Sequence, residues 1–204
     1  MTLPQSAAGI PEFELLINGL LENQAGTLQQ YLNPALTAGL RANLEALLLA
    51  GKMHPAGIGQ KFDFHQNAQV RGDVITWIPN DSTDPFEKAF LEQVATFVAH
   101  LNATCYTGIS DWEFHYALYA PGSFYKRHRD QFHSNRSRKF SMVHYLNDDW
   151  QEKDGGQLLM YTPTGIQTTW PQGGSVVFFQ SDVTEHEVLP AIRPRMSIAG
   201  WLKV

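Results

Sequence analysis

From Asp111 to the end of the chain, hydrophobic side chains recur at every second position, and this period limits the possible folds more than any other feature. Such alternation is typical of β-strands whose two faces have different surroundings. In residues 112–119 one face carries Trp112, Phe114, Tyr116 and Leu118, and the other carries His115, Ala117 and Tyr119. Further strand-like runs cover residues 140–146, 157–161, 165–170, 175–179, 185–189 and 196–203, and turns rich in glycine or proline separate several of them. Many short strands with such turns predict a β-sandwich or jelly roll.

The first half of the chain has the period of helices instead. Asn33-Pro34 and Asp84-Pro85 are helix start signals, because each places an N-cap residue before a proline. The apolar stripe of the first predicted helix, which ends near Gly51, is Leu36, Leu40, Leu44, Leu47 and Leu48. The stripe of the second is Phe86, Phe90, Val94, Phe97, Val98 and Leu101, and a weaker helix is expected from Pro11 to about Glu22. These stripes indicate packing on a sheet rather than a cofactor site.

Together the two periods predict the α+β class, with one domain over residues 1–204. We expect a double-stranded β-helix (jelly roll) core over about residues 111–204, and N-terminal helices over about residues 10–102 packed on its larger sheet. No apolar run approaches the roughly 18 residues that cross a bilayer. The N-terminus lacks the pattern of a secretory signal, and Cys105 is the only cysteine. We therefore expect a cytoplasmic protein without membrane contact.

The charge distribution is uneven. A net charge of −5 and a pI near 5.9 argue against a general nucleic-acid binder, which needs a basic face to neutralise phosphates. Six of the 15 lysines and arginines nevertheless fall within residues 126–139. Such a cluster is typical of a solvated loop. Its position beside the candidate metal ligands also suits contact with an anionic cosubstrate or a polar peptide.

Candidate metal ligands come from two segments. His128 and Asp130 are two positions apart, so on an extended strand both would point to the same face. An H-x-D tripeptide alone is a weak signal. His186, at the start of a later strand, completes a set of two histidines and one carboxylate. That set holds non-haem Fe(II) while it leaves positions open for exchangeable ligands.

An arginine close to His186 points to a second ligand. If the chain turns as a hairpin near Arg193-Pro194, Arg195 enters the neighbouring strand and points to the bottom of the same pocket. A guanidinium binds a carboxylate through two parallel hydrogen bonds. The C5 carboxylate of 2-oxoglutarate requires such a partner when its C1 carboxylate and keto oxygen chelate iron. Arg193 competes for this role, but its place in the turn favours exposure to solvent.

With these residues in place, the sequence resembles the 2-oxoglutarate-dependent prolyl hydroxylases. The family includes animal oxygen-sensing enzymes and bacterial relatives, among them hydroxylases of elongation factor Tu. The resemblance spans roughly residues 57–201. Its motifs are, in order, Arg71–Trp77, Tyr119–Gly122, Tyr125–Asp130, His144–Trp150, Gly155-Gly156, His186–Val188 and Arg195.

The resemblance implies roles for individual residues. The iron ligands would be His128, Asp130 and His186. The cosubstrate site would contain Arg195, Tyr145, Tyr119, Val143 and Leu158, with Arg195 and Tyr145 at the C5 carboxylate and Tyr119 at the chelating end. For either tyrosine, the alternative is a core residue with a satisfied hydroxyl. The residues around the substrate would be Asp73, Trp77, Tyr125, Arg138 and Trp201, and a mobile loop over about residues 55–70 would fold over it.

The resemblance also implies the reaction, which is trans-4-hydroxylation of a prolyl residue in a protein, with elongation factor Tu as the expected partner. Fe(II), 2-oxoglutarate and O2 would be required, and ascorbate is a candidate reductant. Two other classes stay open: a 2-oxoglutarate oxygenase that acts on a free amino acid or another small molecule, and a non-catalytic metal-responsive binding module. Asp130 argues against a halogenase, and the acidic charge argues against a nucleic-acid demethylase.

Overall fold

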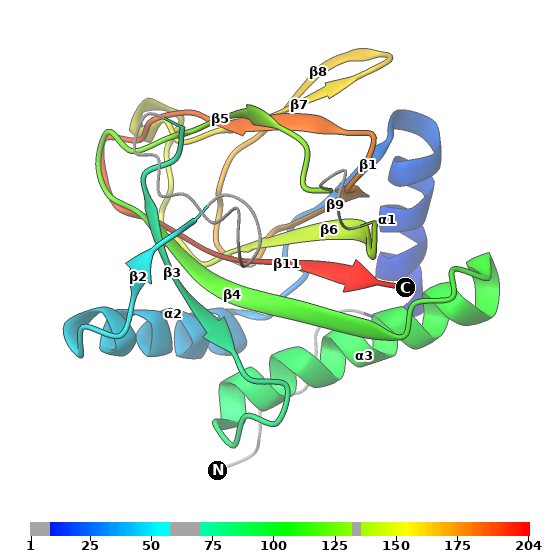
Figure 1. Ribbon diagram of the computed structural model, residues 1–204, viewed down its shortest axis with the longest axis horizontal. Helices are drawn as coiled ribbons and strands as arrows, with labels where there is room; N and C mark the ends of the chain where they lie inside the picture. The colour runs from blue at the N-terminus through cyan, green and yellow to red at the C-terminus, as the bar shows by residue number, and fades with distance from the viewer. Residues whose placement is uncertain (1–8, 58–69, 132–135) are drawn as a thin grey trace.

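The structure is a computed structural model that describes residues 9–57, 70–131 and 136–204. Its strands form two antiparallel sheets (Figure 1). The larger sheet contains, in spatial order, β1 (Ala25–Leu28), β9 (Val176–Gln180), β6 (Arg138–Tyr145), β11 (Arg195–Lys203), β4 (Asp111–Tyr119), β3 (Asp73–Ile78) and β2 (His54–Pro55). The smaller sheet contains β5 (Tyr125–His128), β10 (Glu185–Val188), β7 (Leu158–Thr162) and β8 (Gly165–Thr169).

From β4 onward the chain passes back and forth between the two sheets. Strands β4, β6, β9 and β11 belong to the larger sheet, and the strands between them in sequence, β5, β7, β8 and β10, belong to the smaller one. This alternation of antiparallel strands is a jelly roll. It confirms the fold class predicted from the period of two.

Helices α1 (Ile10–Asn23), α2 (Pro34–Leu49) and α3 (Pro85–Cys105) pack on the larger sheet. Figure 1 shows α2 and α3 on the side of that sheet away from the smaller one. Both of these helices start where the sequence predicts. The Asn33 Oδ1 atom accepts a hydrogen bond from the Leu36 N–H at 2.8 Å, and the Asp84 Oδ1 atom accepts from the N–H groups of Phe86 and Glu87.

The core between the helices and the larger sheet contains nearly all of the predicted stripes. Its buried members from α2 and α3 include Leu36, Leu40, Leu44, Phe90, Val94, Phe97, Val98 and Leu101, and Leu47 and Phe86 pack against them. The prediction for Leu48 is wrong, because its side chain is 42% exposed. Leu48 and Leu49 end α2, and there the helix extends beyond the surface that it covers.

A second, smaller core lies between the two sheets. Strand β11 separates the two cores: Ile198 and Leu202 face the helices, whereas Arg195 and Ser197 face the space between the sheets. Strand β4 divides in the same way, as its period of two predicts, and Ala117 and Tyr119 belong to the inter-sheet layer. The candidate site is built in this layer.

Long-range pairing corrects several expectations. Strands β1, β2 and β3 lie within the segment expected to be helical support, and β3 pairs with β4 in the larger sheet. The hairpin predicted near Arg193-Pro194 is wrong: β10 pairs with β5 and β7, β11 pairs with β4 and β6, and residues 189–194 connect the two sheets. The loop expected over residues 55–70 lies, apart from its two ends, outside the described residues. Within the described ranges, no helix has the length and apolarity needed to span a membrane.

Candidate active site

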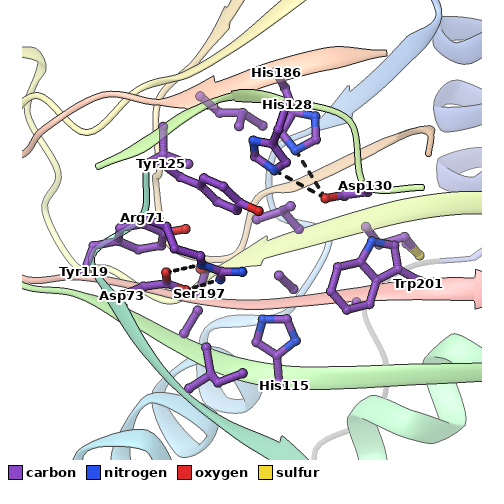
Figure 2. A pocket seen from close by; sticks show the side chains of 18 of the residues that line it. Arg71, Asp73, His115, Tyr119, Tyr125, His128, Asp130, His186, Ser197 and Trp201 are labelled. Atoms are coloured by element: carbon purple, nitrogen blue, oxygen red, sulfur yellow. Dashed lines mark hydrogen bonds and ion pairs between the residues drawn. The ribbon is translucent and has the colours of Figure 1, made fainter. Parts of the chain in front are cut away.

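His128, Asp130 and His186 converge at one end of the smaller sheet. His128 ends β5 and is paired directly with His186 in β10, so their rings lie 4.2 Å apart between centroids. Asp130 lies in a bend just after β5 rather than on an extended strand, which corrects the geometry assumed from the sequence. Its Oδ1 atom is 3.4 Å from the Nε2 atom of His128 and 3.6 Å from that of His186 (Figure 2). One donor atom from each residue lies within 4.8 Å of the others, which suits a single metal ion.

Main-chain carbonyls orient both imidazoles. The Nδ1 atom of His128 is 2.7 Å from the Lys126 carbonyl oxygen, and that of His186 is 3.2 Å from the Thr184 carbonyl oxygen. Because a carbonyl only accepts, each Nδ1 carries the proton and each Nε2 presents a lone pair to the centre of the cluster. The Tyr125 ring stacks on His128 with centroids 3.5 Å apart and fixes the plane of that ring.

The protonation states also suit a metal. Burial lowers the pKa of His186 to about 4, so its imidazole is neutral near pH 7. Burial alone would raise the pKa of Asp130, but the adjacent His186 and His128 rings and the Ser141 hydroxyl outweigh it and lower that pKa below its usual range. A neutral imidazole and an ionised carboxylate are the forms that bind metal.

Arg195 lies in the inter-sheet pocket on the side of the larger sheet. It is 1% exposed, its Nε atom donates to the Gly156 carbonyl at 2.9 Å, and its guanidinium lies 5.1 Å and 5.0 Å from the ring centres of Tyr119 and Tyr145. Within the described part of the chain, the Arg195 Nη2 atom and the Tyr145 hydroxyl are buried without a hydrogen-bond partner. Two such groups side by side fit a buried carboxylate ligand. Arg193, the competing candidate, is partly exposed and faces Asp154 instead.

The remaining predicted residues surround the same pocket. Val143 and Leu158 line it from opposite sheets, beside Arg195. Asp73 is buried and paired with Arg71, whereas Trp77 is 48% exposed. The pocket lining also includes Tyr125, Arg138 and Trp201. The Arg138 guanidinium lies 3.4 Å from the centre of the Trp201 ring and donates to Glu113, so much of its hydrogen-bonding capacity is used within the protein.

Arg71 and His115 are among the pocket residues that received no role from the sequence. The partly buried Arg71 guanidinium binds Asp73 through two hydrogen bonds of 2.7 Å and 2.5 Å and lies 4.3 Å from the centre of the Tyr125 ring. His115 points from β4 into the pocket between Trp77 and Trp201 (Figure 2). Burial lowers the pKa of His115 to about 4, so it is neutral. The alternation in β4 already places His115 on the same face as Tyr119, and therefore on a possible wall of the pocket, whereas the role of Arg71 depends on a contact between distant segments that no local pattern shows.

Comparison with known proteins agrees with this geometry. The family model of the 2OG-Fe(II) oxygenase superfamily matches residues 114–203. Human Egl nine homolog 1 is 29% identical over 166 aligned residues, which cover 71% of this chain and 35% of the human protein. The chain thus spans about a third of the length of that relative.

Two solved structures have the same fold. A prolyl-4-hydroxylase from Pseudomonas putida superimposes with a TM-score of 0.84 at 32% identity, over 94% of this chain and 98% of that one. A prolyl hydroxylase from Trichoplax adhaerens, solved with a peptide fragment of the hypoxia inducible factor oxygen degradation domain, also gives a TM-score of 0.84, at 24% identity over 94% of this chain and 88% of that one.

Proposed function

The chain belongs to the 2OG-Fe(II) oxygenase superfamily, and from the prolyl hydroxylases that it matches within this superfamily we propose that it 4-hydroxylates a prolyl residue in a protein. The resemblance of its sequence motifs to bacterial hydroxylases of elongation factor Tu makes that protein the candidate substrate. Members of the superfamily use Fe(II), 2-oxoglutarate and O2. The proposal assigns His128, Asp130 and His186 as the iron ligands. It assigns Arg195 to the C5 carboxylate of 2-oxoglutarate.

The observation that carries the assignment is the pair of unsatisfied groups below the metal cluster. A buried guanidinium nitrogen and a buried phenol without partners are costly unless a ligand satisfies them. Arg195 and Tyr145 together offer hydrogen bonds to both oxygens of a carboxylate, and Tyr119 lies on the other side of the guanidinium. A diacid that reaches from Arg195 to the metal cluster meets both requirements, which a simple metal-binding module would not explain.

When bound, iron with 2-oxoglutarate and O2 supplies the oxidation of a C–H bond, coupled to formation of succinate and carbon dioxide. The protein residues supply binding, orientation and exclusion of water. His128 and His186 hold their lone pairs toward the metal position, and Arg195 fixes the far end of the cosubstrate. Val143 and Leu158 make the pocket walls apolar, which strengthens these charge interactions.

The mouth of the pocket favours a protein segment over a free amino acid. Trp77 is half exposed, and its ring lies 6.2 Å from that of Trp201 between centroids, so the two form an aromatic surface beside the pocket. Exposed aromatic side chains are typical anchors for a bound peptide. A peptide extends further from the reacting proline than a free amino acid does, so it can use this surface as well as the pocket.

The test compares substrates with iron-loaded protein. Succinate release and a mass gain of one oxygen atom on proline are measured with intact elongation factor Tu, with peptides from its exposed prolyl loops, and with free proline. We expect turnover with the protein or its peptides and little with free proline. Turnover of free proline alone would favour a small-molecule oxygenase. If none of the substrates gave succinate release, the prolyl hydroxylase assignment would be contradicted.

A further inference from the structure

Asp130 is held from behind by a pair of buried serines. The Ser141 hydroxyl in β6 donates to the Oδ2 atom of Asp130 at 2.7 Å, and the hydroxyls of Ser141 and Ser181 are 2.8 Å apart. Ser141 is 1% exposed and Ser181 is fully buried. The other carboxylate oxygen, Oδ1, is the one that faces the imidazoles of His128 and His186.

The direction of the hydrogen bonds between the two serines and Asp130 follows from the number of protons on each group. A serine hydroxyl has one proton, and that of Ser141 is donated to an ionised carboxylate, which can only accept. Ser181 therefore donates its proton to the Ser141 oxygen. A hydroxyl that accepts one hydrogen bond is polarised and donates a second one more strongly. The hydrogen bond from Ser141 to the Oδ2 atom is thus strengthened twice, by the negative charge of the carboxylate and by the hydrogen bond that Ser141 accepts from Ser181.

We propose that Ser141, supported by Ser181, is a positioning residue that restricts Asp130 to binding the metal through Oδ1 alone. The inference rests on the proposed function. Two histidines and a monodentate carboxylate leave three positions of an octahedral ion open. A chelating 2-oxo acid would fill two of these positions and leave the third for O2. A bidentate Asp130 would occupy the position that the oxygen requires, so withholding Oδ2 from the metal preserves it.

The bend that carries Asp130 does not depend on these hydroxyls for its shape. The Gln131 N–H donates to the Ser181 carbonyl at 2.9 Å, and the Gln131 side chain donates to the Arg138 carbonyl, also at 2.9 Å. These contacts remain when the Ser141 hydroxyl is removed. Loss of the hydroxyl therefore frees the Asp130 carboxylate to rotate while the main chain stays in place.

The test measures metal binding without peptide or turnover, so that it is independent of the substrate assignment. Co(II) is titrated into the metal-free parent, S141A and S181A, and the absorption spectrum of bound Co(II) reports changes in the ligand atoms around the ion and in their geometry. S175A is the matched control, because Ser175 is also a buried serine beside a strand of the larger sheet but donates to the Gln172 carbonyl, away from the pocket. We expect the Co(II) affinity of S141A to fall about 10- to 100-fold, as for other residues that orient metal ligands.

The spectrum of bound Co(II) should change in S141A and, in the same direction but less, in S181A, whereas S175A should match the parent. The S181A variant keeps the test decisive if S141A does not fold. Parent-like affinity and spectra in the variants that fold would overturn the proposal, as would a parent that does not bind Co(II). Failure to hydroxylate a prolyl substrate would contradict the proposed function and leave these measurements unaffected.

Discussion

Arg195→Met gives the sharpest test of the cosubstrate site. Met has a similar length but no charge, so it removes the partner of the C5 carboxylate without opening a large space. Hydrogen bonds between charged groups contribute about 1.5–3 kcal/mol each. Arg195→Met removes two such bonds, but the carboxylate then loses less of its hydration on binding, which offsets part of the loss. We therefore expect 2-oxoglutarate binding to weaken by about 3 kcal/mol. That corresponds to roughly a hundredfold increase in Kd.

The same substitution should not destabilise the ligand-free protein. Arg195 is 1% exposed and its Nη2 atom has no hydrogen-bond partner in the described part of the chain, so the empty site contains a charge that is poorly compensated. Replacing a buried, poorly paired charge by an apolar side chain is often neutral or stabilising. We expect the free energy of unfolding of Arg195→Met, measured with urea, to equal or exceed that of the parent.

The assay compares two ligands by calorimetry on the metal-loaded protein: 2-oxoglutarate, and 2-oxopentanoate, which has the same chain length but lacks the C5 carboxylate. The parent should strongly prefer the diacid, and Arg195→Met should lose that preference. Arg193→Met is the control, because Arg193 pairs with Asp154 outside the pocket. If Arg195→Met kept the parent's preference for the diacid, for example because both ligands lost affinity equally, the carboxylate assignment would be refuted.

Three further predictions concern pH, metal and substrate. Burial lowers the pKa of His144 to about 3 from its ordinary value of 6.5. Below pH 6.5 the unfolded chain therefore binds a proton at His144 that the folded chain does not bind. The free energy of unfolding is unaffected by this group above pH 6.5 and falls below that pH. Between pH 6.5 and 5, urea unfolding should show a loss of about 2 kcal/mol from this group that is absent in His144→Phe. Mn(II) at about 100 times its Kd should stabilise the parent by about 2.7 kcal/mol, reversed by EDTA and absent in Asp130→Ala; an equal gain in that variant would place the metal elsewhere. Trp77→Ala should raise the KM for a prolyl peptide by roughly tenfold and leave the 2-oxoglutarate affinity unchanged, and an unaltered peptide KM would remove Trp77 from the substrate surface.

The parts of the fold predicted correctly are those determined by short-range chemistry. The caps at Asn33 and Asp84 determine where α2 and α3 begin, and the alternation in β4 determines which side chains face the helices. Strand β1 was missed because it has only four residues and is stabilised by pairing with β9, far along the chain. The hairpin between β10 and β11 was predicted wrongly because a turn signal does not show that the chain changes sheets there.

In the candidate site, too, local features of the sequence were predicted correctly and contacts between distant segments were not. Residue types and spacing were enough to bring together His128, Asp130, His186 and Arg195 as candidates, because their chemistry is unusual. Ser141 could not be identified in this way, since a serine in a strand has no distinctive pattern. Its contact with Asp130 exists only because β6 passes behind the bend that follows β5.

The two anchors of the site lie in different sheets. His128 and His186 extend from the smaller sheet, and Arg195 extends from the larger one. The distance between the sheets therefore determines the length of diacid that fits. The side chains that hold the sheets at this distance belong to the inter-sheet core, which includes Leu158, Met160, Val177 and Phe179. We therefore expect selectivity between diacids of different length to depend on this packing rather than on the residues that contact the ligand's charges. Substituting larger or smaller side chains in this inter-sheet core should therefore make the protein accept a longer or a shorter cosubstrate.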